Sequence, residues 1–172
     1  MIGTRGVERV ARAVALLSSV WFALVAFWEI GGPFGAGHVA SSTALGIAAE
    51  NMLRWEIIAP VTRYTLTEPL PSQYYCHHPW GIFWTTTLFV RLFGHHDFVC
   101  RLAPALMSAA TPPLLYAIGR ALWSPVAGAL CAGSFVVLPI ALAFANFNAL
   151  EVPVIFGVLL ATWGLVRFTQ TT

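Results

Sequence analysis

The chain has 172 residues, of which 58% are hydrophobic and 9% are charged, with a net charge of +2 and a mean hydropathy of +0.76. Soluble domains carry about 25% charged residues, so this chain lacks the polar side chains needed to cover a globule. The composition excludes an ordinary soluble domain and favours a membrane protein. No run of like charges indicates a nucleic-acid partner.

The first predicted membrane span covers about residues 10–29. Arg5, Arg9 and Arg12 precede or enter it, as in the basic start of a secretory signal. The apolar stretch, however, stays bulky and aromatic to its end and is followed by no small-residue cleavage pattern. We therefore interpret it as a retained span.

Residues from about 30 to 101 form a long connection, expected to lie outside the membrane and to carry helices of its own. Ser41 is a residue type that caps helix N-termini, and the first helix is predicted to run from there to a point before Pro60. Its apolar face is predicted from helical spacing to hold Leu45, Ala48, Ala49, Met52 and Trp55. Its polar face is predicted to hold Thr43, Glu50, Asn51 and Arg54.

The connection also contains the run YYCHHPWGIFW, with five aromatic rings and two histidines. Pro79 suits the first position of a helix, where its missing N–H is not needed, and Gly94 suits the end. One side of this helix is predicted to carry Trp80, Phe83, Trp84, Thr87 and Leu88. The segment is too short to span, so we expect it to lie in the membrane interface with its tryptophans at headgroup depth.

Three further spans are predicted at about residues 102–119, 124–145 and 151–168, since each stretch approaches the ~20 apolar residues that cross a bilayer. Asp97 is expected to cap the second span, which Pro112 and Pro113 interrupt with a kink. The last two spans are expected to be joined by a tight turn near residues 146–151.

Arginine placement sets the predicted orientation. A cytoplasmic N-terminus puts five arginines inside: Arg5, Arg9, Arg12, Arg120 and Arg167. The fold class is then an all-α membrane protein, a single module over residues 1–172. It has about four transmembrane helices, both ends inside, and a long external loop with juxtamembrane amphipathic helices.

Two carboxylates are candidate catalytic groups. Glu151 is the one charged residue between Arg120 and Arg167 and would face the same side as the long connection. The alternative is a solvated turn residue, since a carboxylate near the membrane surface costs less than one at mid-bilayer. Glu50 is the second candidate. Its alternative is an ion pair with Arg54, four residues on in the favourable order.

Four basic or titratable residues are candidates for holding phosphate. His78 precedes Pro79, and His77 stands beside it; these histidines could bind phosphate, bind a metal with Glu151, or shuttle a proton. Arg91 and Arg101 could hold the phosphate of a lipid carrier. Ordinary surface histidines and generic headgroup contacts are the alternatives.

The three cysteines show no metal-binding spacing. Cys131 falls within an apolar run, as a core thiol would. Cys76 and Cys100 would both lie outside the membrane, where an oxidising compartment permits a disulfide.

Several motifs together resemble a known family. The run HHPWGIFWTTTLFVRLFGHHDFVCRLAPAL is followed by LLYAIGRALW and then by ANFNALEVPV. Their order and spacing over roughly residues 10–168 resemble the N-terminal half of bacterial integral-membrane glycosyltransferases of the GT-C class. The closest likeness is to aminoarabinose-transferase-like and protein-mannosyltransferase-like enzymes.

The resemblance implies transfer of a sugar from a polyprenyl-phosphate donor to a lipid, glycan or protein acceptor on the outer face of a bacterial plasma membrane. Membrane lipids would be further partners, and a divalent metal requirement stays open. Glu151 matches the acidic residue of the family's second external loop. The His78-Pro79 pair matches its loop motif, and Arg101 matches the arginine of its Val-Arg-Leu motif.

The sequence departs from the family in two ways. Members carry an acidic pair soon after the first span, but here no carboxylate lies between Glu29 and Glu50, and Ser41 and Ser42 stand near the expected place. A serine hydroxyl cannot act as a base at neutral pH, so Glu50 or Glu151 would have to substitute. Members are also much longer, so this chain is expected to be a fragment. A non-catalytic lipid-binding or scaffold protein, and a small transporter or channel subunit, are the other hypotheses.

Overall fold

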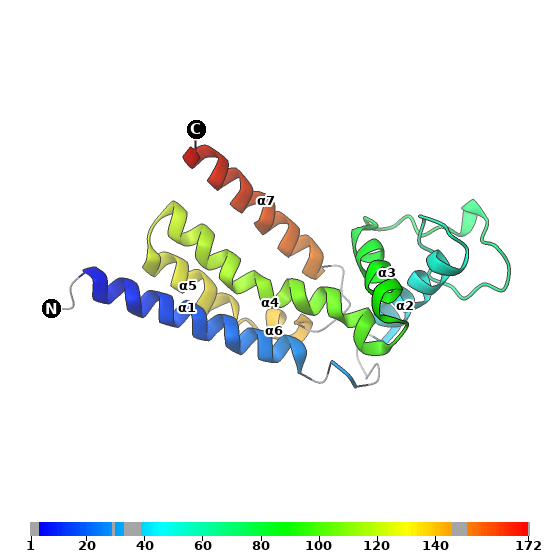
Figure 1. Cartoon of the computed structure of the whole chain (residues 1–172), viewed down its shortest axis with the longest axis horizontal. Helices are drawn as coiled ribbons and strands as arrows, with labels where there is room; N and C mark the ends of the chain where they lie inside the picture. The colour runs from blue at the N-terminus through cyan, green and yellow to red at the C-terminus, as the bar shows by residue number, and fades with distance from the viewer. Residues whose placement is uncertain (1–3, 29, 33–38, 146–150, 172) are drawn as a thin grey trace.

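The computed structural model describes residues 4–28, 30–32, 39–145 and 151–171, side chains at 39–42 excepted (Figure 1). These residues form seven α-helices and one 3-10 turn, without strands, which confirms the all-α prediction. The elements are α1 (Thr4–Phe27), α2 (Val39–Arg54), η1 (Pro71–Gln73), α3 (Gly81–Phe93), α4 (Asp97–Leu122), α5 (Pro125–Phe135), α6 (Pro139–Phe144) and α7 (Glu151–Thr171).

A helix bundle with α4 at its centre makes up most of the molecule. Helices α1, α5 and α7 pack along α4, and α3 packs at its N-terminal end (Figure 1). Within the described residues, three helices are long and apolar enough to cross a membrane: α1, α4 and α7. They correspond to the predicted first, second and fourth spans.

The helix ends that carry Arg12, Arg120 and Arg167 meet at one end of the bundle. At one end, Arg120 Nη2 lies 3.5 Å from Glu8 Oε1, and Gln170 Nε2 donates to the Ala121 carbonyl at 3.1 Å. The start of α1 therefore meets the ends of α4 and α7, and the arginines of these helix ends share one side of the bundle. The C-terminus of α1 and the N-termini of α4 and α7 lie at the other end (Figure 1).

The segment predicted as the third span is not one helix. Helix α5 ends at Phe135 and α6 begins at Pro139, so residues 124–145 contain two short helices. Leu138 is extended, with φ −67° and ψ 125°, because the ring of a following proline disfavours helical geometry in the preceding residue. The prediction of four continuous spans is thus replaced by three long helices and an interrupted segment.

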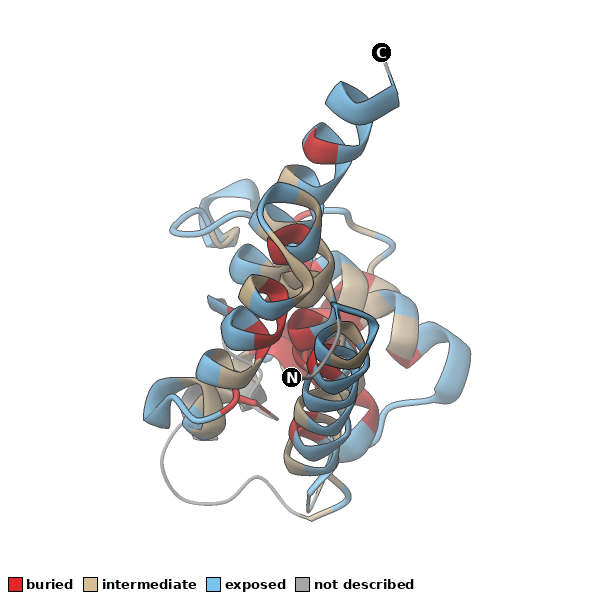
Figure 2. Ribbon diagram, turned by 90° about the vertical axis from the view of Figure 1, so that its left-hand side faces the viewer, coloured by how far each residue is buried: buried red, intermediate tan, exposed pale blue. Residues whose placement is uncertain are grey.

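Helices α1 and α4 carry buried residues where they meet other helices and exposed residues elsewhere (Figure 2). Three of the four buried residues of α1 are alanines, and the fourth is Phe22. In α1, Ala11, Ala15 and Ala26 are buried, whereas Leu16 and Leu17 are about two-thirds exposed. Lipid tails are as apolar as leucine, so association in a membrane depends on close backbone approach at small residues. The exposed leucines therefore suit a hydrocarbon environment.

Helices α4 and α5 approach each other closely at two glycines. A Cβ added at Gly128 would lie 2.5 Å from the Tyr116 carbonyl oxygen, and one added at Gly119 would lie 2.7 Å from Gly128 Cα. The turn between the helices is fixed by Ser124, whose hydroxyl accepts a hydrogen bond from the Ala127 N–H at 3.1 Å. The Ser124 cap and the contact between Gly119 and Gly128 together hold α5 against α4.

Helices α2 and α3 form a second, smaller core with the chain between them. Leu45, Met52 and Phe83 lie in one of its clusters, and a second cluster joins Ala49 to Cys100 of α4. Asn51 was predicted on the polar face of α2, but it is 1% exposed. Its amide donates to the carbonyls of residues 61 and 63, both at 2.8 Å, because that part of the connection folds over this face.

Other local predictions shift by one or two residues. Helix α2 begins at Val39 rather than Ser41, and α3 begins at Gly81, two residues after Pro79. Gly94 ends α3 with a positive φ of 86°, as its residue type suggests. His96, not Asp97, occupies the N-cap of α4, so Asp97 is the first helical residue.

Two further expectations concern the prolines of α4 and two of the cysteines. Helix α4 continues through Pro104, Pro112 and Pro113, which membrane helices tolerate when neighbouring helices surround the freed carbonyls. Cys76 is exposed and Cys100 is buried, and both are free thiols, so the structure contains no disulfide between them. The predicted turn near residues 146–151 lies outside the described residues except for Glu151.

Candidate functional site

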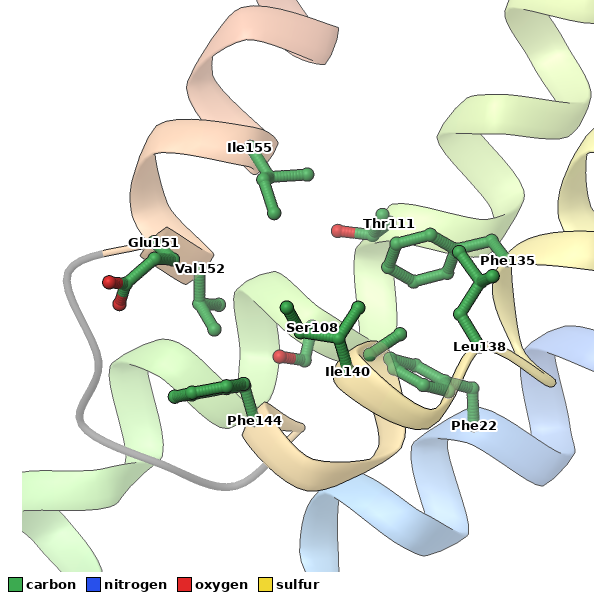
Figure 3. Close-up of a pocket in the computed structure, with 11 residues that line it drawn as sticks. Phe22, Ser108, Thr111, Phe135, Leu138, Ile140, Phe144, Glu151, Val152 and Ile155 are labelled. Atoms are coloured by element: carbon green, nitrogen blue, oxygen red, sulfur yellow. The ribbon is translucent and has the colours of Figure 1, made fainter. Parts of the chain in front are cut away.

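A pocket of about 300 Å³ opens between α1, α4, α6 and the start of α7 (Figure 3). Its lining is largely apolar and consists of Phe22, Ser108, Thr111, Phe135, Leu138, Ile140, Ala141, Phe144, Glu151, Val152 and Ile155. The break between α5 and α6 creates much of this wall, because Leu138 and Ile140 stand on either side of Pro139. A volume of this size is at the lower end for small-molecule pockets, which are about 300–1,000 Å³.

Two hydroxyls lie inside this apolar lining. Ser108 and Thr111 are 4% and 2% exposed and sit three residues apart on α4, on one face of the helix. The Thr111 hydroxyl donates to the Met107 carbonyl at 2.8 Å. Sequence reasoning missed both residues, although two polar residues at helical spacing within an apolar span are a recognisable signal.

Glu151 occupies the rim of the same pocket. It is the first residue of α7 and is exposed, and its carboxylate turns away from the interior that Val152 and Ile155 face (Figure 3). A negative charge is favoured at a helix N-terminus, where the N–H groups point outward. Of the predicted site residues, Glu151 is the one in this pocket.

His78 and His77 gather around one tyrosine in the connection. The Tyr75 hydroxyl and His78 Nδ1 are 2.5 Å apart, with the two rings stacked at 5.8 Å between centroids. The His77 ring meets the edge of the same tyrosine at 5.5 Å. The Trp80 indole N–H donates to the Tyr75 carbonyl at 2.7 Å, which ties the cluster to the start of α3. Nε2 is the ring nitrogen of His78 that this arrangement leaves for a ligand.

Arg101 lies in the first turns of α4 and is 9% exposed. Its guanidinium donates to the carbonyl of Gly32 and, through Nε, to the carbonyl of Asp97 at 3.4 Å. The side chain thus links α4 to the chain that follows α1. These contacts direct it to backbone carbonyls within the protein.

Arg91 is separated from the histidine cluster by the length of α3. It lies in the last turn, whereas His78 precedes the first, and a 13-residue helix is roughly 20 Å long. One phosphate group therefore cannot contact both. Glu151 is also apart from α3, because it lies beside Ser108, about 16 Å along α4 from the end that α3 covers.

Glu50 is half-buried in α2. The alternative of an ion pair between Glu50 and Arg54 is not seen among the described residues. Instead, the Arg54 guanidinium donates to the Tyr64 hydroxyl at 3.3 Å. That hydrogen bond is the main reason why the pKa of Arg54 is raised, and the charge of Glu50 adds to the effect. The ion pairs among the described residues are those of Glu8 with Arg12 and Arg120.

In the part of the chain that the structure describes, no three histidine, cysteine, aspartate or glutamate side chains converge as metal ligands would. His77, His78 and Glu151 in particular do not form one cluster.

A family model matches residues 77–172, more than half of the chain, and its description is dolichyl-phosphate-mannose-protein mannosyltransferase. The chain belongs to this mannosyltransferase family. The match begins at His77 and includes α3, α4, the interrupted α5–α6 segment and α7. It therefore contains Glu151 and every other residue of the pocket wall except Phe22. No curated protein and no solved structure matches the chain at a significant level.

Membership in the mannosyltransferase family fits the apolar helices described above and indicates a membrane glycosyltransferase. It supports the resemblance to GT-C-type glycosyltransferases that the motifs suggested. Helices α1 and α2 lie outside the matched residues.

Proposed function

We propose that the chain is part of a membrane glycosyltransferase that takes a sugar from a polyprenyl-phosphate donor. The acceptor is a lipid, a glycan or a protein on the external face of a bacterial plasma membrane, and the N-terminus is cytoplasmic. The observation that carries the proposal is the family match over residues 77–172, which include ten of the eleven residues that line the pocket.

The pocket suits the hydrocarbon part of such a donor. Eight of its eleven lining residues are apolar, so it offers little to a sugar and much to an isoprenoid chain, whose burial is driven by the hydrophobic effect. Glu151 at the rim would then stand near the polar end of the donor. In this proposal Glu151 accepts the proton that the acceptor hydroxyl loses when it attacks the sugar, and the phosphate leaves with the electron pair of the broken bond.

Phosphate contacts are assigned to His78 and His77, with Arg101 and Arg91 as further candidates. His78 is supported by its fixed ring, which leaves Nε2 available beside the interfacial helix. Arg91 would have to contact a different phosphate group from the histidines, because the length of α3 separates it from them. The attacked sugar carbon is bonded directly to the phosphate, so the histidines and Glu151 can serve one transfer step only in an arrangement that brings them closer together than they are in this structure.

The test is transfer of radiolabelled sugar from a polyprenyl-phosphate donor by the full-length protein in membranes. Loss of a general base lowers the rate by about 10²–10⁴-fold, so Glu151→Gln or Glu50→Gln should show such a loss, according to which residue is the base. Glu68→Gln is the matched control, since Glu68 is an exposed carboxylate in the connection. Normal transfer by both Glu151→Gln and Glu50→Gln would refute the assigned roles.

A second candidate function is a non-catalytic membrane protein that binds a polyprenyl lipid or scaffolds another glycosyltransferase. The absence of any carboxylate between Glu29 and Glu50 favours it. Copurification of a polyprenyl lipid with the wild-type protein, without sugar transfer, would decide for this alternative.

A further inference from the structure

We call α2, α3 and the chain between them (residues 39–93) the outer module. A second concavity, of about 740 Å³, lies on it between the end of α2 and the side of α3. We name it the α2–α3 groove; its lining is Met52, Leu53, Glu56, Ile57, Ile58, Trp84, Thr87, Leu88 and Arg91. Its floor is aliphatic and aromatic, and it carries one carboxylate and one guanidinium. Within the described residues, neither Glu56 nor Arg91 forms an ion pair or a side-chain hydrogen bond, so both remain available to a ligand.

The walls of the α2–α3 groove are fixed by hydrogen bonds that leave its surface open. The Trp84 indole N–H donates to the Ile58 carbonyl at 3.1 Å, while the residue stays 49% exposed. The Thr87 hydroxyl contacts Met52 Sδ at 3.4 Å across the floor. A preorganised aromatic surface of this kind lowers the entropic cost of binding.

Glu56 holds an unusual backbone conformation. Its φ is 52°, the only positive φ of a non-glycine residue among those described. Helices often end with such a residue, but that residue is usually glycine, which has no Cβ to strain. Strained positions cluster at ligand sites, and here the strain accompanies a carboxylate that faces a groove.

The chemistry of the lining narrows the class of ligand. An anionic ligand would meet Glu56, and a cationic ligand would meet Arg91. An extended peptide needs backbone partners, whereas the N–H and C=O groups within the flanking helices are already paired. A sugar ring is neutral, has polar edges rich in hydroxyls, and has C–H faces that pack on an aromatic ring.

We infer that the α2–α3 groove binds a neutral carbohydrate, with Trp84 under the ring face and Glu56 and Arg91 hydrogen-bonded to its hydroxyls. The inference rests on the proposed function, in which it identifies the acceptor as a glycan. It also assigns Arg91 to the acceptor and leaves the donor phosphate to the histidine cluster.

The test is calorimetric titration of the full-length protein in phosphatidylcholine nanodiscs with neutral tetrasaccharides of mannose, glucose and galactose. At least one should bind, and Glu56→Ala and Arg91→Ala should each weaken binding roughly tenfold or more. Glu68→Ala and Arg63→Ala are matched controls, since both side chains are exposed elsewhere in the connection. Glu56→Gly should lose binding while raising the melting temperature, which separates ligand loss from misfolding.

Failure to bind any neutral tetrasaccharide would overturn the inference, as would binding that survives both groove variants. Stronger binding of a heparin or chitosan tetrasaccharide would overturn it too, because the groove would then select by charge. Sugar transfer without groove binding would leave the proposed function standing and remove the inference. Groove binding without sugar transfer would leave the carbohydrate site standing and remove the proposed function.

Discussion

Replacing Gly128 with alanine should separate α5 from α4. The added Cβ would lie 2.5 Å from the Tyr116 carbonyl oxygen and 2.9 Å from the Arg120 nitrogen. Nonbonded carbon contacts are optimal near ~3.5–4.0 Å, so one helix would have to move by about 1 Å. Both close atoms are backbone atoms of α4, and no side-chain rotation can relieve the contact.

The expected loss follows from two opposing effects. Overpacking of a close contact costs about 1–3 kcal/mol, whereas alanine is favoured over glycine in a helix by about 1 kcal/mol. The net destabilisation of Gly128→Ala should therefore be up to about 2 kcal/mol. Gly157→Ala is the control, because no atom lies within 4 Å of its added Cβ; that variant should be as stable as the parent or up to about 1 kcal/mol more stable.

The assay is unfolding in mixed micelles with increasing dodecyl sulfate, followed by near-ultraviolet circular dichroism. We expect Gly128→Ala to be less stable than the parent, and Gly157→Ala to be as stable as the parent or more stable. If Gly128→Ala were as stable as Gly157→Ala, the close α4–α5 crossing would be refuted.

The remaining predictions concern single hydrogen-bonding side chains. Asn51→Ala should destabilise the outer module by about 1–3 kcal/mol, because two backbone carbonyls lose their donors; hydrogen exchange of the connection should then rise, while exchange in α4 stays unchanged. Ser124→Ala should cost about 1 kcal/mol through loss of the α5 cap, and Ser124→Asp should retain that stability in the same micelle assay. Arg101→Gln should cost about 1–3 kcal/mol, since a charged donor to the Gly32 carbonyl is removed; an unchanged melting temperature would argue against its role as a tether.

Much of the fold was predictable because hydropathy and residue type act locally. The first, second and fourth predicted spans lie within or close to α1, α4 and α7, and Gly94 ends α3 as expected. The effect of each proline on its helix was not predictable from the sequence. Pro139 starts a new helix, while Pro112 and Pro113 lie within α4, where three neighbouring helices pack along the chain.

The candidate site was harder to predict, because it depends on tertiary contacts. Asn51 looked like a surface residue of an amphipathic helix, and its burial arises from chain that follows it by ten or more residues. Glu151 was found from its isolation as a charge, but the pocket beneath it required the break at Pro139 and the hydroxyl of Ser108. The positive φ of Glu56 has no sequence signal, since glutamate is not a residue type typical of that conformation.

The proposed function depends most on the placement of the outer module and Glu151 on one side of the membrane, opposite the helix ends that carry Arg12, Arg120 and Arg167. Native Cys76 is exposed in the connection and serves as a reporter. Glu151→Cys and Thr171→Cys are reporters for the two ends of α7 when introduced with Cys76→Ser, and Cys131→Ser is included throughout.

The measurement is labelling of intact cells with a membrane-impermeant maleimide, before and after permeabilisation. The account predicts that Cys76 and the cysteine at position 151 react in intact cells, and that the cysteine at position 171 reacts only after permeabilisation. Reaction of positions 76 and 151 from opposite sides would contradict the account, and so would reaction of both only after permeabilisation.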